Sequence, residues 1–492
     1  MHATLTGCAL IGLEPRAVSV EALVAGGLPG LHVVGLGDAA VMEAKERVRA
    51  ALKHARLPLP PSRVTVNLAP ADLRKVGPAY DLPIALAILA ARGAIPKQRV
   101  AGAVIVGELA LDGRLRPVAG ALAAALLARA LGAAVVVPPD NRAEAALVAG
   151  VEVIAPRDLL EAIAWARGAA IATEAPTPEA PRSGAPAATA SEEADPNLDL
   201  ADVRGQALAR RALEIAAAGM HALLLIGPPG CGKSMLARRL PGLLPPLDDD
   251  DAWTATLVRS VVGERLGGLV RRAPFRAPHH GGGGGGLLGG GPGLRPGEAS
   301  LAHGGALFLD ELPEWPRPAL EGLRGPLEEG EVELVRAHGR RTFPARFALI
   351  AAMNPCPCGH AGDPGRPCRC HPRDRQRYQG RLSGPLLDRF DLRVQLVRPS
   401  PTELARPGEA TAPVAARVAR ARARALARQG VVNARLAGGA LDRHAPLDDE
   451  GRALLALAAR SALSARGADR LRRVARTIAD LAGEERTSGA HV

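Results

Sequence analysis

The sequence predicts an α/β protein of several domains, and three observations support this fold class. An apolar run at 223–226 is followed at once by a glycine-rich loop and a segment that can start a helix. A second apolar run, at 306–309, ends in two acidic residues. In the first 168 residues, short valine-rich runs alternate with alanine-rich segments, which is typical of strands and helices packed in layers.

The loop after the first apolar run reads GPPGCGKS, the G-x-x-x-x-G-K-[ST] form of a phosphate-binding loop in its usual strand–loop–helix context. Its glycines let backbone N–H groups turn toward phosphates, and the following helix adds the positive end of its dipole. We expect Lys233 to reach the β- and γ-phosphates and Ser234 to ligate Mg²⁺. The expected ATP-binding residues are Gly227, Pro228, Pro229, Gly230, Cys231, Gly232, Lys233, Ser234 and Asp310.

The second motif, LFLDE at 307–311, completes the chemistry that the loop begins. Asp310 is predicted to hold the metal together with Ser234, and Glu311 to orient the attacking water. Loop, strand context and acidic pair together predict an ATPase that uses ATP and Mg²⁺.

The domain organisation follows from changes in composition along the chain. Residues 1–168 form a first α+β unit, and the Pro- and Ser-rich stretch 169–197 is predicted to be a flexible linker. Residues 198–400 hold the nucleotide domain, and 401–492 are predicted to be helical. The run GGGGGGLLGGGPG at 281–293 is expected to form no stable element, because glycine loses the most conformational freedom on ordering.

Composition narrows the class of partner and the compartment. The chain has 492 residues and a net charge of +12, which favours a polyanion such as nucleic acid, although an arginine-rich proteome gives the same bias. No apolar run reaches the roughly 18–20 residues of a membrane span, and no secretory signal is visible. A cytoplasmic protein without disulfides is therefore expected.

Four of the six cysteines lie close together in the loop 355–371. Cys356, Cys358, Cys368 and Cys370 follow the spacing C-x-C-x₉-C-x-C, and four thiolates can complete a tetrahedral Zn²⁺ site. A loop without metal and a redox switch are the alternatives. The arginines that follow indicate either a DNA-facing element or a solvated basic face: Arg373, Arg375, Arg377 and Arg381.

Five longer blocks carry a resemblance to a known family. They read FRAPHH (275–280), RPGEASLAHGGALFLDELPE (295–314), FPARFALIAAMNPCPCG (343–359), SGPLLDRFDL (383–392) and VARTIADLAG (474–483). In this order they resemble the bacterial YifB/ComM family of magnesium-chelatase-like AAA+ ATPases. The resemblance implies a P-loop AAA+ nucleotide domain with a C-terminal helical lid, working as a hexameric motor. Members of the family are linked to branch migration of DNA during natural transformation.

The same resemblance assigns three further catalytic residues besides Glu311. Asn354 matches the sensor-1 position, and Arg389 matches the arginine finger that reaches into a neighbouring subunit, an interaction worth about 10³–10⁵ in rate. Arg466 matches sensor 2, with Arg470 and Arg473 as neighbouring candidates. The chain departs from the family at Gly281–Gly286, where side chains expected to face a central pore are missing, and this leaves coupling to the substrate open.

The first unit resembles the proteolytic domain of Lon proteases at 77–91 and 107–122. Those enzymes use a Ser–Lys dyad, but residues 77–80 contain no serine and Leu122 stands near the lysine position. Peptidase activity is therefore not expected. Tyr80 and Asp81 could mark a residual site, although structural hydrogen bonding is the simpler interpretation.

The sequence predicts an ATP-driven motor that acts on DNA in branch migration, recombination or transformation. Two alternatives stay open: a chelatase-type ATPase subunit that remodels a protein partner, and a nucleotide-gated DNA-binding scaffold with weak hydrolysis.

Overall fold

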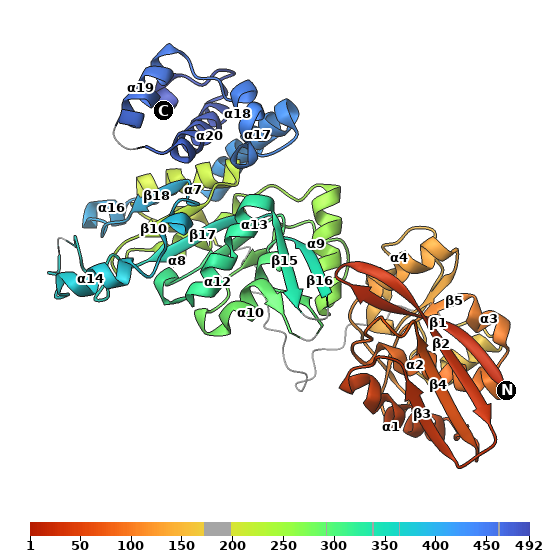
Figure 1. Cartoon of the computed structure of the whole chain (residues 1–492). Helices are drawn as coiled ribbons and strands as arrows, with labels where there is room; N and C mark the ends of the chain where they lie inside the picture. The colour runs from red at the N-terminus through yellow and green to blue at the C-terminus, as the bar shows by residue number, and fades with distance from the viewer. Residues whose placement is uncertain (172–197, 292, 337–338, 364, 461–462) are drawn as a thin grey trace. The chain divides into compact units, whose positions relative to one another are not determined.

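The structure is a computed structural model that describes residues 1–171, 198–291, 293–336, 339–363, 365–460 and 463–492. These residues form two compact units (Figure 1). The first comprises Met1–Ala188, Trp253–Val270 and Pro292–Arg295, and the second Thr189–Ala252, Arg271–Gly291 and Pro296–Val492, as far as they are described. The predicted linker lies outside the described residues from 172 to 197. The predicted domain boundaries stay a prediction, and they differ from these units at 253–270.

The first unit is built on a seven-stranded mixed sheet in the order β3-β4-β2-β1-β5-β8-β9. The two longest strands, β1 and β2, form an antiparallel hairpin that the sequence analysis did not identify. The strands are β1 (His2–Ile11), β2 (Glu14–Ala25), β3 (Gly30–Val34), β4 (Arg63–Ala69), β5 (Ala103–Ile105), β8 (Ala134–Val136) and β9 (Val153–Ile154). The longer helices are α1 (Ala39–His54), α2 (Asp81–Ala91), α4 (Ala121–Leu131) and α6 (Leu159–Ala166). Shorter elements are α3 (Lys97–Ala101), α5 (Arg142–Ala145), β6 (Glu108–Leu109) and β7 (Leu115–Arg116).

The residues that stand where Lon proteases carry the Ser–Lys dyad lie in an apolar cluster of this unit. Ala79 and Leu122 pack there together with Trp253 and Leu257. The neighbouring Asp81 is fully buried, and its carboxylate accepts hydrogen bonds from Arg47 Nε (2.6 Å), Arg47 Nη2 (3.0 Å) and the Leu109 N–H (3.2 Å). Asp81 therefore fixes α2 against α1, which favours the structural interpretation of this residue.

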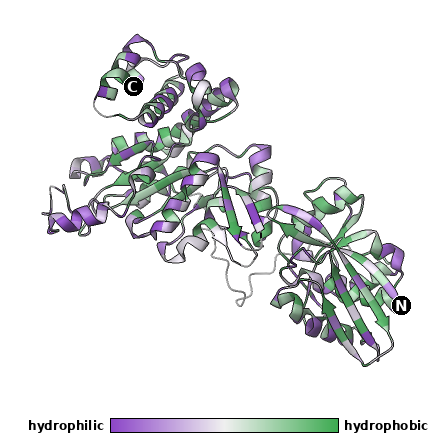
Figure 2. Cartoon of the chain, viewed as in Figure 1, coloured by the Kyte–Doolittle hydropathy of each residue, from purple (hydrophilic) through white to green (hydrophobic). Residues whose placement is uncertain are grey.

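The second unit contains a five-stranded, fully parallel sheet in the order β11-β14-β17-β10-β18. Its strands are β10 (Leu223–Ile226), β11 (Phe275–Arg276), β14 (Ala306–Leu309), β17 (Ala348–Met353) and β18 (Leu392–Gln395). The central strands are buried on both faces and so read as continuous apolar runs, drawn green in Figure 2. Because the strands are parallel, their carboxyl ends share one edge of the sheet.

Short helices and hairpins surround this sheet. The helices are α7 (Ala207–Gly219), α8 (Lys233–Ala237), α10 (Gly283–Leu288), α11 (Glu298–Leu301), α12 (Arg317–Gly322), α13 (Arg324–Glu329), α14 (Pro372–Gln379) and α15 (Gly384–Leu387). Helix α9 (Asp249–Val262) begins in this unit, and its residues from Trp253 onward belong to the first unit. The remaining strands are β12 (Gly289–Gly290), β13 (Arg295–Pro296), β15 (Glu331–Arg336) and β16 (Gly339–Pro344). Figure 2 shows α14 as strongly hydrophilic.

The expectation that the glycine run forms no stable element is wrong, because residues 283–288 form helix α10. The helix packs on α12: a Cβ added at Gly322 would lie 2.3 Å from Leu288 Cδ1, and one at Gly284 would lie 3.6 Å from Ala319 Cβ. Leu287 is buried as well. Tertiary packing of two leucines thus outweighs the low helix propensity of glycine.

The C-terminal part is helical, as predicted. Its helices are α16 (Pro401–Ala405), α17 (Thr411–Gln429), α18 (Gly438–His444), α19 (Asp449–Arg460) and α20 (Ala465–Ala482). None of the helices among the described residues combines the length and the apolar character needed to cross a bilayer.

A buried polar network joins this helical lid to the sheet. The Asp480 carboxylate on α20 accepts hydrogen bonds from Arg428 (2.6 Å), Arg476 (2.8 Å) and Asn433 (2.8 Å). One helical turn away, Thr477 Oγ1 lies 2.7 Å from His221 Nε2, and His221 Nδ1 lies 3.0 Å from Asp391 Oδ2. His221 lies two residues before β10 and Asp391 directly before β18, so the lid is anchored at the amino ends of the strands.

Candidate nucleotide site

The carboxyl ends of three neighbouring strands bring most of the predicted site residues together. The phosphate-binding loop follows β10, the pair Asp310 and Glu311 follows β14, and Asn354 follows β17. Strand β17 pairs with both β10 and β14, so Asn354 lies between the loop and the acidic pair. This edge is where open parallel sheets bind their ligands.

Lys233 is held at the centre of the loop. Its ammonium donates to Gly227 O (2.7 Å), Pro228 O (3.0 Å) and Asn354 Oδ1 (3.1 Å), and the residue is 9% exposed. Burial lowers the pKa of Lys233, and the nearby negative groups, among them Asp310 and Glu311, oppose that shift. A buried cation of this kind gains most from a polyphosphate, whose charge replaces the lost hydration.

The backbone of the loop depends on glycine. Gly230 and Gly232 adopt φ angles of +76° and +96°, which side chains rarely tolerate. At Gly227 a Cβ would lie 2.7 Å from Leu396 O. Gln206, which sequence reasoning missed, steadies the loop because its Nε2 donates to Cys231 O (3.1 Å) and Val397 O (2.6 Å).

Ser234 and Asp310 form the predicted metal-binding pair. The Ser234 hydroxyl donates to Asp310 Oδ2 at 2.6 Å, and Asp310 Oδ1 accepts the Glu311 N–H at 2.9 Å. The Trp315 indole N–H donates to Asp310 O (3.1 Å) and so fixes the turn after β14. A hydroxyl beside a carboxylate is an oxygen donor set that fits Mg²⁺ bound together with phosphates.

Glu311 stands exposed at the open side of the site, with a φ of +48°. Its carboxylate lies 3.7 Å from His280 Nδ1. The sequence analysis assigned His280 no role at this site, although His280 belongs to the block FRAPHH that carries the family resemblance. FRAPHH begins with β11, and β11 pairs with β14, so the segments that follow the two strands leave the sheet side by side.

The structure does not bring Arg389 and Arg466 to this edge. Both line a cavity of about 640 Å³ at the amino ends of the strands, next to the lid. Arg389 precedes β18, whose Leu392 pairs with Leu223 at the start of β10, whereas the phosphate-binding loop leaves the far end of β10. The two arginines therefore lie at the edge opposite this chain's own loop.

Arginines and acidic residues line this cavity in equal numbers, seven of each. Burial lowers the pKa of Arg389, and the charges of four neighbouring arginines lower it further: Arg466, Arg324, Arg470 and Arg473. Arg389 pairs with Glu328, yet its buried Nε has no hydrogen-bond partner among the described residues.

Among the three candidates for sensor 2, Arg466 has the most accessible side chain. Arg470 donates to Asp388 O (2.5 Å) and Phe390 O (3.3 Å), and Arg473 donates to Ala434 O (3.1 Å). Arg466 is exposed. The sensor-2 assignment of Arg466 stays a prediction.

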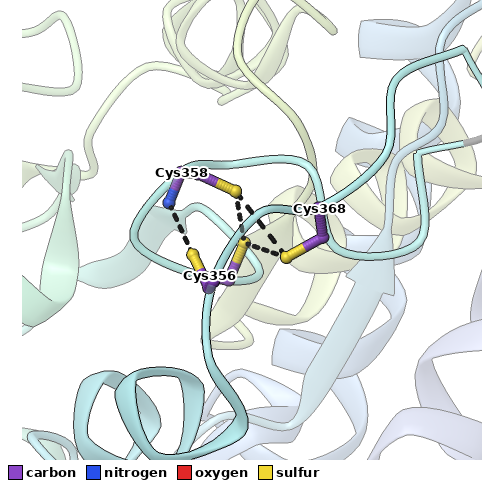
Figure 3. A group of neighbouring side chains, drawn as sticks. Cys356, Cys358 and Cys368 are labelled. Atoms are coloured by element: carbon purple, nitrogen blue, oxygen red, sulfur yellow. Dashed lines mark hydrogen bonds between the residues drawn. The ribbon is translucent and has the colours of Figure 1, made fainter.

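The four loop cysteines converge beside the phosphate-binding loop, and Figure 3 shows three of their sulfurs turned toward one another. The Cys356 sulfur lies 3.5 Å from that of Cys358 and 3.6 Å from that of Cys368, and the latter two are 3.7 Å apart. With Cys370 included, the sulfurs lie within 4.8 Å of one another. Tetrahedral Zn–S bonds of about 2.3 Å place sulfurs about 3.8 Å apart, so the donor set fits zinc.

Comparisons with known proteins agree with this fold. The family model described as magnesium chelatase, subunit ChlI matches residues 199–404. Models of subunit ChlI and of its C-terminal region match 20–141 and 408–492. These matches define the class: a magnesium-chelatase-type AAA+ ATPase, for which ATP and Mg²⁺ are the expected ligands.

Relatives match along nearly the full chain. A protein of Mycobacterium tuberculosis strain H37Rv is 46% identical, over 96% of this chain and 94% of its own. YifB of Escherichia coli K12 is 43% identical over 96% and 92%. The competence protein ComM of Haemophilus influenzae is 42% identical over 98% and 94%. The chain belongs to the YifB/ComM family, which confirms the predicted family and fold class.

Replacing Lys233 tests the phosphate-binding loop. Lys233→Ala should weaken ATP binding by about 100-fold, because charge-assisted hydrogen bonds to the phosphates are lost. Titration with a fluorescent ATP analogue measures the affinity. Lys53→Ala, which removes an exposed lysine of α1, serves as the matched control. Tight binding by Lys233→Ala would contradict the assignment of the loop.

Proposed function

We propose that this protein is a cytoplasmic, ATP-driven motor that acts on DNA as a ring of subunits, six by resemblance to its family. The observation that carries the DNA assignment is a pair of arginines on the β15–β16 hairpin, the exposed Arg336 and the half-buried Arg341; the third hairpin arginine, Arg340, pairs with Glu333. The net charge of +12 and the name of the Haemophilus relative, a competence protein, point in the same direction. The need for ATP and the four reduced thiols favour the cytoplasm.

The hairpin offers guanidinium groups that the rest of the described chain does not neutralise. Arg336 and Arg341 donate to the backbone carbonyls of Val335 and Arg340, and among the described residues neither has a carboxylate partner. Arg336 also lies close to the glycine-rich segment, with its Nη2 3.8 Å from the Cβ position of Gly290. Arginines with open donors are suited to phosphate contacts along a DNA backbone.

The predicted nucleotide-site residues lie at two opposite edges of the sheet, and this separation supports assembly of the subunits into a ring. Each chain carries a phosphate-binding loop at one edge of its sheet and Arg389 and Arg466 at the other. If the edge that carries the loop faces the arginine edge of the next subunit in a ring, each ATP site gains the two arginines that its own chain does not supply. Guanidiniums supplied by a neighbour would then stabilise charge on the transferring phosphoryl group.

Within such a site, each residue has a separate task. The loop N–H groups and Lys233 bind the β- and γ-phosphates, while Ser234 and Asp310 would hold Mg²⁺, which neutralises phosphate charge when bound. Glu311 orients the attacking water from the open side, and Asn354 positions it from between the strands. The lid, anchored through His221, would transmit the nucleotide state to Arg466 on α20.

We also propose that Cys356, Cys358, Cys368 and Cys370 bind one structural Zn²⁺. The sulfur separations and the burial of Cys356 support a closed tetrahedral site. Backbone N–H groups, first that of His360, lower the pKa of Cys358 to about 5, whereas burial and hydrogen bonds with the neighbouring thiols raise the pKa of Cys368 and Cys370. The support for zinc is therefore the arrangement of the sulfurs.

ATP hydrolysis should rise several-fold with single-stranded DNA and with a four-way junction. Steady-state ATPase assays without DNA and with each DNA measure this, with Glu311→Gln as the blank. The double variant Arg336→Ala/Arg341→Ala should keep the basal rate but lose the stimulation. Arg49→Ala/Arg129→Ala, which removes the same charge from helices of the first unit, is the control.

DNA affinity of the wild type should also fall steeply with salt, with a logarithmic slope of about −0.9 per phosphate contacted. Rates unchanged by any DNA, together with no salt-dependent DNA binding, would shift the assignment to an ATPase that acts on a protein partner. Salt-sensitive binding without stimulation would instead indicate a DNA-binding scaffold with weak hydrolysis.

Arg389→Ala should bind ATP normally but lose hydrolysis by about 10³-fold or more, because the finger acts on the neighbour's nucleotide. Mixed with Glu311→Gln subunits, it should regain part of the turnover, since some interfaces then contain both intact residues. Mixing Arg389→Ala with the double variant Glu311→Gln/Arg389→Ala is the control. Equal rates in the two mixtures would exclude a site shared between subunits.

The purified full-length chain should contain about one zinc per chain by elemental analysis. Cys368→Ser should lose this metal, whereas Cys8→Ser, which replaces a buried cysteine of the first unit, should retain it. A wild-type protein with reduced thiols, full stability and no bound metal would refute the zinc site.

A further inference from the structure

The loop that carries the four cysteines begins inside the nucleotide site. Asn354, which accepts a hydrogen bond from Lys233, precedes Cys356 by two residues, and Cys356 is fully buried. The Gly359 N–H donates to Cys356 O at 2.9 Å and closes a tight turn around the first two cysteines. The Cys358 N–H then donates to the Cys370 sulfur at 3.3 Å, which ties the turn to the end of the loop.

This turn lies directly against the phosphate-binding loop. Gly359 has a φ of +81°, and a Cβ added to it would lie 2.6 Å from Pro229 Cδ, 2.7 Å from Pro229 Cγ and 3.8 Å from Asn354 Cγ. The absence of a side chain at Gly359 thus allows the cysteine turn to contact Pro229 and Asn354 at once. A shift of the turn would move both residues.

The far side of the cysteine loop is tied to the same region. Asp363 lies 3.0 Å from His360 Nδ1, and its carboxylate pairs with Arg398 at 3.3 Å. Arg398 follows Val397. The Gln206 side-chain amide donates both to the carbonyl of Val397 and to that of Cys231 in the phosphate-binding loop. The cysteine loop therefore meets the phosphate-binding loop along two routes, through Gly359 and through Asp363.

We propose that the cysteine loop is a brace for the phosphate-binding loop, so that Zn²⁺ held by the four thiolates raises the affinity of the nucleotide site. This inference rests on the proposed zinc site but not on the proposed action on DNA. Closing a loop of this length around one metal ion removes its freedom to move, and the rigid turn then holds Pro229 and Asn354 in their binding positions. Since coupling between two binding sites is reciprocal, bound nucleotide must also strengthen the hold on the metal.

The loop offers a matched pair of glycines to test the brace. Gly359 and Gly362 both have left-handed backbones, with φ angles of +81° and +76°, so alanine costs a similar backbone strain at each. At Gly362, however, no atom of the described residues lies within 4 Å of the added Cβ, whereas at Gly359 the Cβ collides with Pro229. The two variants keep all four cysteines and differ in the contact with the phosphate-binding loop.

Gly359→Ala should keep about one zinc per chain but bind a fluorescent ATP analogue about tenfold more weakly than wild type, within the usual range of coupling between sites. Gly362→Ala should retain both the zinc and the wild-type affinity. Wild-type affinity in a zinc-loaded Gly359→Ala variant would overturn the brace, and so would equal weakening in both variants.

A second measurement tests the reciprocal effect in the unmodified protein. Zinc release from the wild-type chain to a coloured chelator should be several-fold slower with saturating Mg²⁺ and a non-hydrolysable ATP analogue than without nucleotide. Equal release rates would overturn the proposal. If the purified wild-type chain holds no zinc at the start, the proposed zinc site is refuted, and the brace with it. A lack of ATPase stimulation by DNA, in contrast, has no bearing on the brace.

Discussion

The parallel pairing of β14, β17 and β10 is the constraint on which the site depends. Each strand is an uninterrupted apolar run that must be buried on both faces, so the polar residues of each segment are forced beyond its end. Because the three strands run the same way, the residues that follow them meet at one edge, where Lys233 donates to Asn354 and Ser234 donates to Asp310. The buried strands of the sheet, and not the loops alone, therefore fix the positions of the nucleotide-site residues.

The opposite edge of the same sheet carries a different kind of chemistry. Arg389 and Arg466 face a cavity there, and the lid is held beside it by His221, Thr477 and Asp480 in a network of buried hydrogen bonds. Burying such groups is tolerated when their partners are present, and it makes the geometry specific. A subunit with its nucleotide ligands at one edge and its arginines at the other is suited to work in a chain of identical neighbours.

Two segments with poor intrinsic order gain it from their surroundings. The glycine-rich helix α10 exists because Leu287 is buried and Leu288 packs against α12. The cysteine loop, rich in glycine and proline, is shaped by the convergence of four sulfurs and by its contact with Pro229. In both cases a few long-range contacts compensate for the entropy that the backbone loses on ordering. Both segments lie next to residues proposed to bind DNA or nucleotide, so their order bears on function.

The sequence by itself determined the phosphate-binding loop, the acidic pair, the family and the helical lid, because each is a local pattern with its own strand or helix signal. The resemblance singled out Asn354, which the structure places directly after β17, and its sensor role stays a prediction. Only the tertiary structure decided that α10 is a helix, that β1 and β2 form the longest strands, and that His280 approaches Glu311. It also placed Arg389 and Arg466 away from their own loop. These features arise from contacts between segments distant in sequence, and a local pattern carries no information about which distant side chains will meet.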